Sequence, residues 1–464
     1  MNGSWRNRVL VSFGLLAFLW FYLIARSLHE RDIMWLQILF LAFAAHGALL
    51  LIVGAVGGRA VLPRDEAYRP FVSVLVPAKN EARVIEGTVR SLCALDYAGP
   101  DGAPHYEIII IDDRSTDATP AILERLGAEC LITVVRPEPD AAASKAGALA
   151  VGMRDARGEI IAVFDADARV APDFLRRLVP TLAPPEVAAV QGRKLIANGA
   201  VNALTRVQAD EYAVFQTLLQ RGRALLRGFN CLVGSGLVVK RDRIDRVGGW
   251  NEAALTEDLD LTLRLQLAGW AVRYCEDAVV WEEAVSTWRA LLKQRTRWTE
   301  GSLQILFGLL PEILRGRMAA SVTADSGGAG AEVPSPHPMS IVRRIDALYF
   351  FSGALVLPIT VLSGYLYALV SFVGQVTLSL TVPEPVLTTA SVIFTSAALL
   401  GVVTEGPQHP LRAAGVLARF VPFSIYQMIV TPLALYRFTR SLWTGRIEWV
   451  KTEHAGSVVP VPHK

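Results

Sequence analysis

Two pairs of aspartates follow apolar segments and could bind a cation or the polar groups of a ligand. Asp112 and Asp113 come after the apolar residues 106–111, and Asp165 and Asp167 come after 159–164. Aspartate commonly ends strands and caps helices, which is the alternative interpretation. Two acidic pairs at equivalent positions favour a functional site, because clustered carboxylates destabilise each other unless a cation or donor groups compensate.

Asp165 and Asp167 flank Ala166 in a D-x-D arrangement. We expect the two carboxylates to point to different sides, so that one reaches a metal ion while the other braces the loop or binds a ribose. Hard oxygen ligands suit Mg²⁺ or Mn²⁺, and either ion would also bind a diphosphate. We therefore expect Asp167 and Asp165 to hold Mg²⁺ or Mn²⁺.

A third acidic group, Glu257 and Asp258, opens a segment in which leucines alternate with mostly polar residues. An acidic first turn stabilises a helix through the helix dipole, which is the simpler explanation. The functional interpretation is a general base, which takes a proton from an acceptor hydroxyl as a new bond forms.

The segment 288–306 has helical periodicity and contains Gln294, Arg297 and Trp298 at spacings of three and four residues. These side chains share one helical face. They offer an amide, a guanidinium that can pair with phosphate, and an aromatic ring on which a sugar can stack. A basic amphipathic helix lying on a membrane is the alternative. Arg295 is expected to point elsewhere, toward lipid phosphates or the phosphorylated ligand.

The elements that must position these residues are strands alternating with helices. Apolar runs at 71–76, 106–111, 131–135 and 159–164 predict buried strands, the first ended by Pro77, and residues 79–92 predict a helix. Such alternation indicates an α/β domain with a mainly parallel sheet. Ligands bind beyond the carboxyl ends of these strands, where the aspartates stand.

Long apolar runs at both ends of the chain predict membrane-spanning helices. Residues 9–25 and 34–56 are each close to the ~20 residues that cross a bilayer. A cleaved signal peptide is the alternative for the first run, but a second span follows it at once. Runs at 347–383, 386–403 and 413–436 predict three or four further spans, the last interrupted only by Arg419.

Basic residues flank the central domain on both sides, which places it in the cytoplasm. The tail also contains basic residues, which place it in the cytoplasm too and so favour six spans over five; they are Arg437, Arg440, Arg446 and Lys451. The net charge of +3 gives no reason to expect nucleic acid as a partner. The four cysteines form no C-x-x-C pair and are expected to be free thiols.

Together the motifs resemble family 2 glycosyltransferases, and more narrowly the membrane-integrated synthases of cellulose, hyaluronan and poly-N-acetylglucosamine. The resemblance rests on the order of the two aspartate pairs, the Thr256-Glu257-Asp258 triplet and Gln294-x-x-Arg297-Trp298, together with the segment 76–81. It implies a GT-A-type domain between N- and C-terminal transmembrane helices. The loop Gly234-Ser235-Gly236 departs from relatives that line the acceptor differently.

The resemblance also implies a role for each matching residue. Asp112 or Asp113 would hold the uracil of a UDP-sugar, and Lys145 would lie near its diphosphate. Asp165 and Asp167 would bind UDP and the metal. Asp258 would be the base with Glu257 beside the acceptor, and Gln294, Arg297 and Trp298 would form the acceptor end and the diphosphate clamp. Residues 449–454 resemble a cytoplasmic gating segment of these synthases.

The expected organisation is two transmembrane helices at 1–60, a cytoplasmic catalytic domain at 65–285 and amphipathic interface helices at 286–317. A flexible linker at 318–342, three or four transmembrane helices at 343–440 and a cytoplasmic tail at 441–464 complete it. We expect a multi-pass protein of the inner or plasma membrane. The resemblance includes no regulatory cyclic-nucleotide domain after the last span, which argues against a bacterial cellulose synthase proper.

The expected reaction is an inverting transfer from a UDP-sugar to a growing β-linked polysaccharide that is exported as it grows. The alternative acceptor is a membrane lipid such as a ceramide, diacylglycerol or polyprenyl phosphate, because the same motifs occur in ceramide glucosyltransferases. A transporter or scaffold with a degenerate catalytic domain is a further alternative. It is disfavoured because all the acidic motifs are present and the spans carry almost no ionisable residues.

Overall fold

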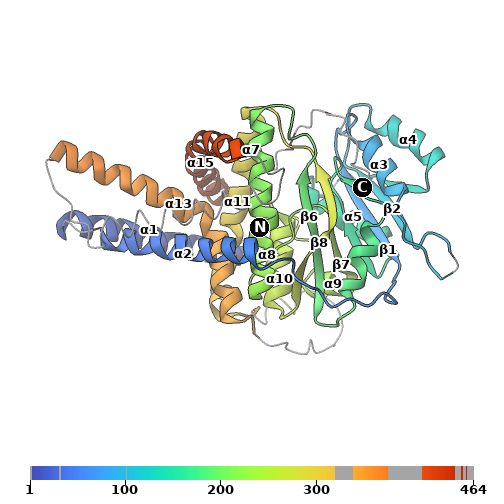
Figure 1. Cartoon of the computed structure of the whole chain (residues 1–464), viewed down its shortest axis with the longest axis horizontal. Coiled ribbons are helices and arrows are strands. Elements are labelled where there is room, and N and C mark those ends of the chain that lie inside the picture. The colour runs from blue at the N-terminus through green and yellow to red at the C-terminus, as the bar shows by residue number, and fades with distance from the viewer. Residues whose placement is uncertain are drawn as a thin grey trace.

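A computed structural model describes residues 3–30, 33–100, 102–139, 141–318, 338–374, 410–444, 451–452 and 456. One central eight-stranded sheet is flanked by helices, and a group of long helices extends from one side of this domain (Figure 1). The sheet has the strand order β3-β2-β1-β4-β7-β6-β8-β5. Its strands are β1 (Val72–Ala78), β2 (Tyr106–Asp112), β3 (Ile132–Val135), β4 (Ile160–Val163), β5 (Arg169–Val170), β6 (Val187–Ile196), β7 (Leu237–Lys240) and β8 (Ala271–Glu282).

The sheet has two halves that differ in strand direction. In the parallel half, β3, β2, β1 and β4 all run the same way. In the mixed half, β7 is antiparallel to β4 and β6, β8 is parallel to β6, and β5 is antiparallel to β8. The expectation of a mainly parallel sheet is therefore correct for the first half only. The apolar strand pattern identifies buried strands but does not distinguish the direction of those that follow β4.

Two details of the first predicted elements are wrong. Pro77 lies within β1 instead of ending it, because β4 pairs with β1 only over Val72–Leu75 and no ladder bond to β4 is needed at Pro77. The helix predicted over 79–92 begins six residues later, as α3 (Ile85–Cys93). The residues before it form a turn in which Asn80 has a left-handed φ of 54°, a conformation that a helix cannot contain.

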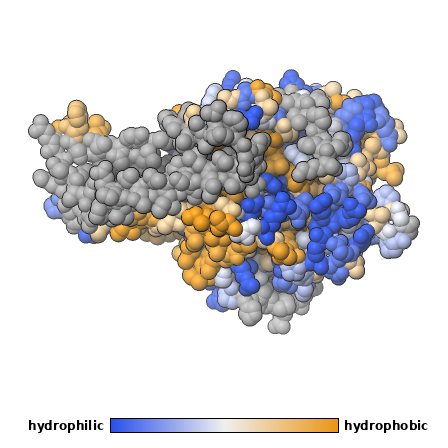
Figure 2. Space-filling model, viewed as in Figure 1, coloured by the Kyte–Doolittle hydropathy of each residue, from blue (hydrophilic) through white to orange (hydrophobic). Residues whose placement is uncertain are grey.

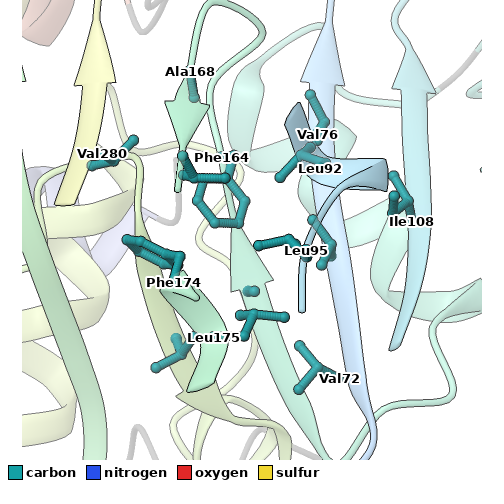
Figure 3. Packing of buried hydrophobic residues seen from close by; sticks show 14 of the residues in the cluster. Val72, Val76, Leu92, Leu95, Ile108, Phe164, Ala168, Phe174, Leu175 and Val280 are labelled. Atoms are coloured by element: carbon teal, nitrogen blue, oxygen red, sulfur yellow. The ribbon is translucent and has the colours of Figure 1, made fainter. Parts of the chain in front are cut away.

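Helices cover both faces of the sheet, and the sheet separates the core into two layers. One face packs against α3, α4 (Thr119–Glu129) and α6 (Phe174–Leu178). Figure 3 shows this layer, in which Phe164 and Phe174 meet edge to face at 5.3 Å between ring centroids. The other face packs against α5 (Lys145–Asp155), α9 (Arg241–Arg246) and α10 (Glu257–Leu267). Such burial on both faces rigidly positions the loops at the strand ends.

Apart from the short turn 179–182, which packs in the first core layer, the remaining helices lie on the side of the domain from which the long helices extend (Figure 1). Their bounds are α1 (Gly3–Glu30), α2 (Met34–Val56), η1 (Val179–Leu182), α7 (Ala203–Tyr212), the π-helical turn η2 (Ala213–Leu218), α8 (Leu219–Leu226), α11 (Trp288–Arg315), α13 (Ile341–Gly374) and α15 (Pro410–Thr444). Figure 1 shows α11 between α10 and the long helices α1, α13 and α15. The helix predicted at 288–306 is confirmed and extends to Arg315.

Two helices within the described residues are long and apolar enough to cross a membrane, Val9–Ser27 in α1 and Met34–Val56 in α2. The predicted run 386–403 lies outside the described residues, and the C-terminal spans stay a prediction. Arg419, inside the last predicted run, pairs with the buried Asp210 of α7 at 2.7 Å. That part of α15 therefore lies against the domain. Figure 2 shows a hydrophobic area where the long helices meet the domain, while the far end of the domain is mostly hydrophilic.

The junction between domain and long helices contains a buried ion cluster. Asp346 of α13 accepts hydrogen bonds from Arg223 of α8 and from the backbone N–H of Phe229, and it lies 3.1 Å from His46 of α2. These contacts join three helices that are far apart in sequence. The last residues of the linker predicted at 318–342 are packed against the domain. Met339 is buried, and its N–H donates to the Gly316 carbonyl at 2.7 Å. Most of its interior lies outside the described residues.

Candidate active site

Lys145 stands at the centre of the predicted residues, at the first position of α5. Ser144 caps this helix by accepting from the Gly147 N–H at 3.1 Å. The Lys145 Nζ lies 2.6 Å from Asp165 Oδ1 and 3.0 Å from Glu257 Oε1, and it donates to the Gly234 carbonyl at 2.9 Å. One ammonium group thus joins the D-x-D segment to the acidic start of α10.

Asp258 approaches the same point beside Gly234. A β-carbon at Gly234 would lie 3.3 Å from both Asp258 Oδ2 and Lys145 Nζ and 3.7 Å from Asp165 Oδ2. Gly234 also has a left-handed φ of +83°, which favours glycine. Burial, and then the neighbouring Glu257 charge, raise the pKa of the Asp258 carboxyl to about 7, although Lys145 opposes the shift. A carboxylate with such a pKa is suited to accept a proton near neutral pH.

Asp167 contacts a different part of the chain from Asp165. Its Oδ2 accepts from the Glu283 N–H at 2.9 Å, just after β8. Asp165 is turned toward Lys145, and its own N–H donates to Ser235 Oγ at 3.0 Å. The two aspartates therefore contact two different loops, because the chain turns after β4, where the Ala168 N–H donates to the Asp165 carbonyl at 3.0 Å.

The donor set at this point fits a divalent metal that shares its ligands with a substrate. Among the described residues, no group of three or more histidine, cysteine or acidic side chains could hold a metal ion unaided. Mg²⁺-type ions at phosphate sites need only one or two carboxylates, since water and phosphate oxygens complete the shell. Asp165 and Asp167 supply such carboxylates, with Lys145 as the neighbouring fixed cation.

Asp112 and Asp113 lie at the end of β2, and both are buried. Asp112 Oδ2 lies 3.5 Å from Arg136 Nε, and Asp113 lies between Lys79, at 3.3 Å, and Arg114, at 2.7 Å. These three cations are partly exposed. The position is at the carboxyl ends of the parallel strands, where ligands bind in sheets of this kind.

The helix α11 brings Arg297 to the acidic cluster. Arg297 donates weakly to the Leu255 carbonyl, at 3.5 Å, and its buried guanidinium interacts with the charges of Glu257, Asp165 and Asp258. Burial lowers the Arg297 pKa, although these charges oppose the shift. Gly301 permits this approach, since a β-carbon there would lie 2.6 Å from Thr256 Oγ1.

The neighbours of Arg297 have different environments. Gln294 and Trp298 are half-buried, and no contact of Gln294 with the acidic cluster is resolved. The expectation that Arg295 faces lipid phosphates or the ligand is wrong. Arg295 is buried, pairs with Glu211 at 2.6 Å and stacks on the Trp298 ring at 4.3 Å. A helical wheel gives its direction, but only the tertiary packing shows that α7 occupies that side.

A second lysine and acid lie beside the cluster, Lys194 and Glu282, and neither was predicted from the sequence. Lys194 Nζ lies 2.7 Å from Glu282 Oε1 and donates to the Val233 carbonyl at 2.7 Å. A signal was present for Glu282, because it and Glu283 follow an apolar strand just as the predicted aspartates do. No such signal marks Lys194, because its position beside Glu282 depends on the pairing of β6 with β8.

The C-terminal segment also reaches the site. Lys451 Nζ lies 3.1 Å from Glu81 Oε1, the Thr452 hydroxyl accepts from Arg297 at 3.5 Å, and the Gly456 N–H donates to Glu283 at 3.2 Å. The described part of the predicted gating segment 449–454 therefore borders the acidic cluster. Its cytoplasmic location stays a prediction.

Comparison with known proteins identifies the family. Residues 69–301 match the family described as glycosyltransferase like family 2, so the chain belongs to that family. Over 236 residues, 51% of this chain and 48% of the other, it is 46% identical to a beta-monoglucosyldiacylglycerol synthase of Synechocystis sp.. It is 33% identical to glucomannan 4-beta-mannosyltransferase 7 of Arabidopsis thaliana, over 54% of this chain and 46% of the other. The chain thus spans about half the length of the curated relatives that it matches.

The fold has a solved counterpart. A mannosyltransferase from Pyrobaculum calidifontis, in complex with GDP-Man and Mn²⁺, superposes with a TM-score of 0.53 at 22% identity. The match covers 89% of this chain and 100% of the other. It shows the same GT-A-like mixed α/β architecture. The family and the fold therefore agree with the resemblance expected from the motifs. The Synechocystis relative is named for a glycolipid product and the Arabidopsis relative for a polysaccharide product, and this chain is 46% identical to the first and 33% identical to the second.

Proposed function

We propose that the protein transfers one hexose, most simply glucose, from a UDP-sugar to the hydroxyl of a diacylglycerol-type lipid, with inversion to a β-linkage. The observation that carries this proposal is the position of Asp258. The half-buried Asp258 carboxylate, with a pKa of about 7, lies beside two cations, Lys145 and Arg297, and two candidate phosphate-side acids. The 46% identity to a beta-monoglucosyldiacylglycerol synthase supports the choice of sugar and acceptor.

In the proposed reaction, ionised Asp258 accepts the proton of the acceptor hydroxyl. The hydroxyl oxygen forms a bond to the anomeric carbon as the bond from that carbon to the diphosphate oxygen breaks, and UDP leaves with the electron pair. One base without a covalent nucleophile gives single displacement and inversion. Lys145 and Arg297 stabilise the charge that develops on the diphosphate. A Mg²⁺ or Mn²⁺ ion held by Asp165 and Asp167 would supply further charge neutralisation there.

Other predicted residues bind substrate in this proposal. Asp112 and Asp113 accept hydrogen bonds from the uracil, in the crevice at the end of β2. Trp298 and Gln294 line the acceptor side. The domain faces the cytoplasm, where a UDP-sugar is available, and the helices at both chain ends hold it in the inner or plasma membrane.

The arrangement of α11 supports a lipid acceptor. Ten residues separate Arg297, at the acidic cluster, from Phe307, which packs with Val9 of α1 and Phe438 of α15. At 1.5 Å per residue this is about 15 Å along the helix. Because α1 contains a candidate span, we expect the hydroxyl of a lipid at the bilayer surface to reach Asp258 while the acyl chains of the lipid stay in the bilayer.

The test is product analysis with purified protein in vesicles that contain diacylglycerol. A panel of UDP-sugars is added with Mg²⁺ or Mn²⁺, and UDP release is measured beside mass spectrometry of the lipids. We expect a lipid carrying one hexose, absent with Asp258→Asn. A polysaccharide product without glycolipid would instead support the alternative suggested by the glucomannan relatives. UDP release without any transfer to diacylglycerol would overturn the acceptor assignment.

A further inference from the structure

The loop 231–236 borders both Asp258 and the D-x-D segment, and the domain holds it on both sides of its centre. The Leu232 N–H donates to Thr262 Oγ1 of α10 at 2.9 Å. Beyond the loop centre, Ser235 Oγ accepts from the Asp165 N–H at 3.0 Å. Gly234 at its centre lies against the Asp258 carboxylate. The loop is therefore a wall of the space in which an acceptor hydroxyl must meet the base.

Two lysines hold successive carbonyl groups at the centre of this loop. Lys145 donates to the Gly234 carbonyl at 2.9 Å, and Lys194 donates to the Val233 carbonyl at 2.7 Å. They approach from different elements, α5 and β6. Charged donors form the stronger class of hydrogen bonds, so both contacts restrict the loop more than neutral donors would.

Lys194 remains charged although it is almost fully buried, with 5% of the residue exposed. Burial acts to lower its pKa, but the Glu282 carboxylate at 2.7 Å outweighs burial and the pKa is raised. The next residue, Glu283, donates its N–H to Asp167 Oδ2. The pair thus connects the loop to the strand end that also holds the D-x-D segment.

We propose that Lys194, braced by Glu282, is a positioning residue that holds the loop 231–236 beside Asp258 and so places the acceptor hydroxyl for deprotonation. This inference rests on the proposed function, because it assumes that Asp258 is the base. Lys194 acts on the acceptor side through its hydrogen bond to the loop and its ion pair with Glu282. It interacts with Asp165 through charge alone, whereas Lys145 contacts Asp165 directly on the donor side.

The experiment compares Lys194→Met/Glu282→Met with wild type and with Lys240→Met. The double variant removes the hydrogen bond from Lys194 to the Val233 carbonyl and leaves no buried charge of the pair without its partner. Replacing a buried ion pair by apolar side chains is often neutral for stability. Lys240 is the matched control, because it is also a strand lysine that donates to a carbonyl, that of Pro184 at 3.0 Å. Lys194→Arg tests rescue, since arginine retains the charge and the donors.

We expect the double variant to lose up to about 100-fold in kcat/KM for the acceptor, as misplacement of reacting groups does. Its Kd for UDP with Mg²⁺ and its KM for the UDP-sugar should stay within about twofold of wild type. Lys194→Arg should recover part of the loss, and Lys240→Met should match wild type. Unchanged acceptor kinetics in the double variant, or an equal loss of UDP binding, would overturn the proposal.

The outcome is separable from that of the proposed function. If wild type glycosylates an oligosaccharide instead of diacylglycerol, the proposed acceptor is wrong, and the same variants are compared with the oligosaccharide. If the double variant does not fold, Lys194→Gln replaces it, because glutamine is neutral and its shorter amide retains a donor. An acceptor-side loss in Lys194→Gln with normal UDP binding supports the positioning role, and wild-type acceptor kinetics contradict it.

Discussion

The two halves of the sheet carry acids in different electrostatic settings. At the end of the parallel half, Asp113 is compensated by Lys79 and Arg114, whose side chains are 31% and 32% exposed. In the mixed half, Glu282 is compensated by Lys194, whose side chain is 5% exposed. The first half meets water, and the second is largely shielded from it.

This difference separates binding from chemistry. Charges screened by water interact weakly, so the parallel half suits reversible recognition of a soluble nucleotide. Shielded charges interact strongly, so the mixed half can shift a pKa and stabilise charge that develops during reaction. Asp165 follows β4 at the boundary. Lys145 joins it to Glu257 of α10, a helix that packs on β8 and so belongs to the mixed half.

The largest expected effect is the loss of the base in the mixed half. Asp258→Asn should lower kcat about 1000-fold, because general-base catalysis typically contributes 100- to 10,000-fold. The Kd for UDP should stay nearly unchanged, since the donor is held mainly by other residues. Transfer kinetics and calorimetric UDP binding measure the two effects. An equal loss of kcat and of UDP affinity would contradict the assignment of Asp258 to the chemical step in the mixed half.

A buried ion pair in the mixed half should matter more to stability than an exposed pair in the parallel half. Arg264 lies 2.6 Å from Asp260, with both side chains 8% exposed. Arg264→Met leaves Asp260 buried without its cation and should lower the free energy of unfolding by about 3 kcal/mol. Urea denaturation of the detergent-solubilised protein measures the change.

The matched variant is Arg157→Met in the parallel half. Arg157 lies 2.8 Å from Glu107, but its side chain is 74% exposed. This change should cost less than about 1 kcal/mol, because water screens such pairs. Similar losses in the two variants would contradict the proposed contrast in shielding.

The pH dependence of transfer should follow the ionisation of Asp258. Its pKa is raised to about 7, chiefly by burial. The active form is the ionised one, so kcat/KM should fall about tenfold per pH unit below 7 and level off above it. Initial rates from pH 5 to 9 give the profile. A profile that is flat between pH 5 and 7 would argue against Asp258 as the base.

The smallest effect is expected at the nucleotide crevice. Asp113→Asn should raise KM for the UDP-sugar about tenfold and leave kcat nearly unchanged, since a charge-assisted hydrogen bond contributes 1.5–3 kcal/mol at most. Donor titrations at saturating acceptor measure both constants. A large loss of kcat would place Asp113 in the chemical step, contrary to the division between the halves.

The sequence by itself predicted most of the parallel half, because its information is local. The apolar runs at 106–111 and 159–164 each give a buried strand, and the aspartates that follow them lie at its carboxyl end. The predicted helix that carries Arg297 is likewise present. The chemical roles of these residues stay predictions until they are measured.

The mixed half was decided by tertiary structure. Whether β7 runs parallel or antiparallel to β4 depends on the chain path, which local periodicity does not contain. The meeting of Lys194 with Glu282 requires β6 to pair with β8, and the burial of Arg295 requires α7 to lie beside α11. The sequence determined which side chains could carry charge and put the aspartates at the carboxyl ends of β2 and β4. Only packing decided which charges were shielded from water, and shielding gives Asp258 its raised pKa.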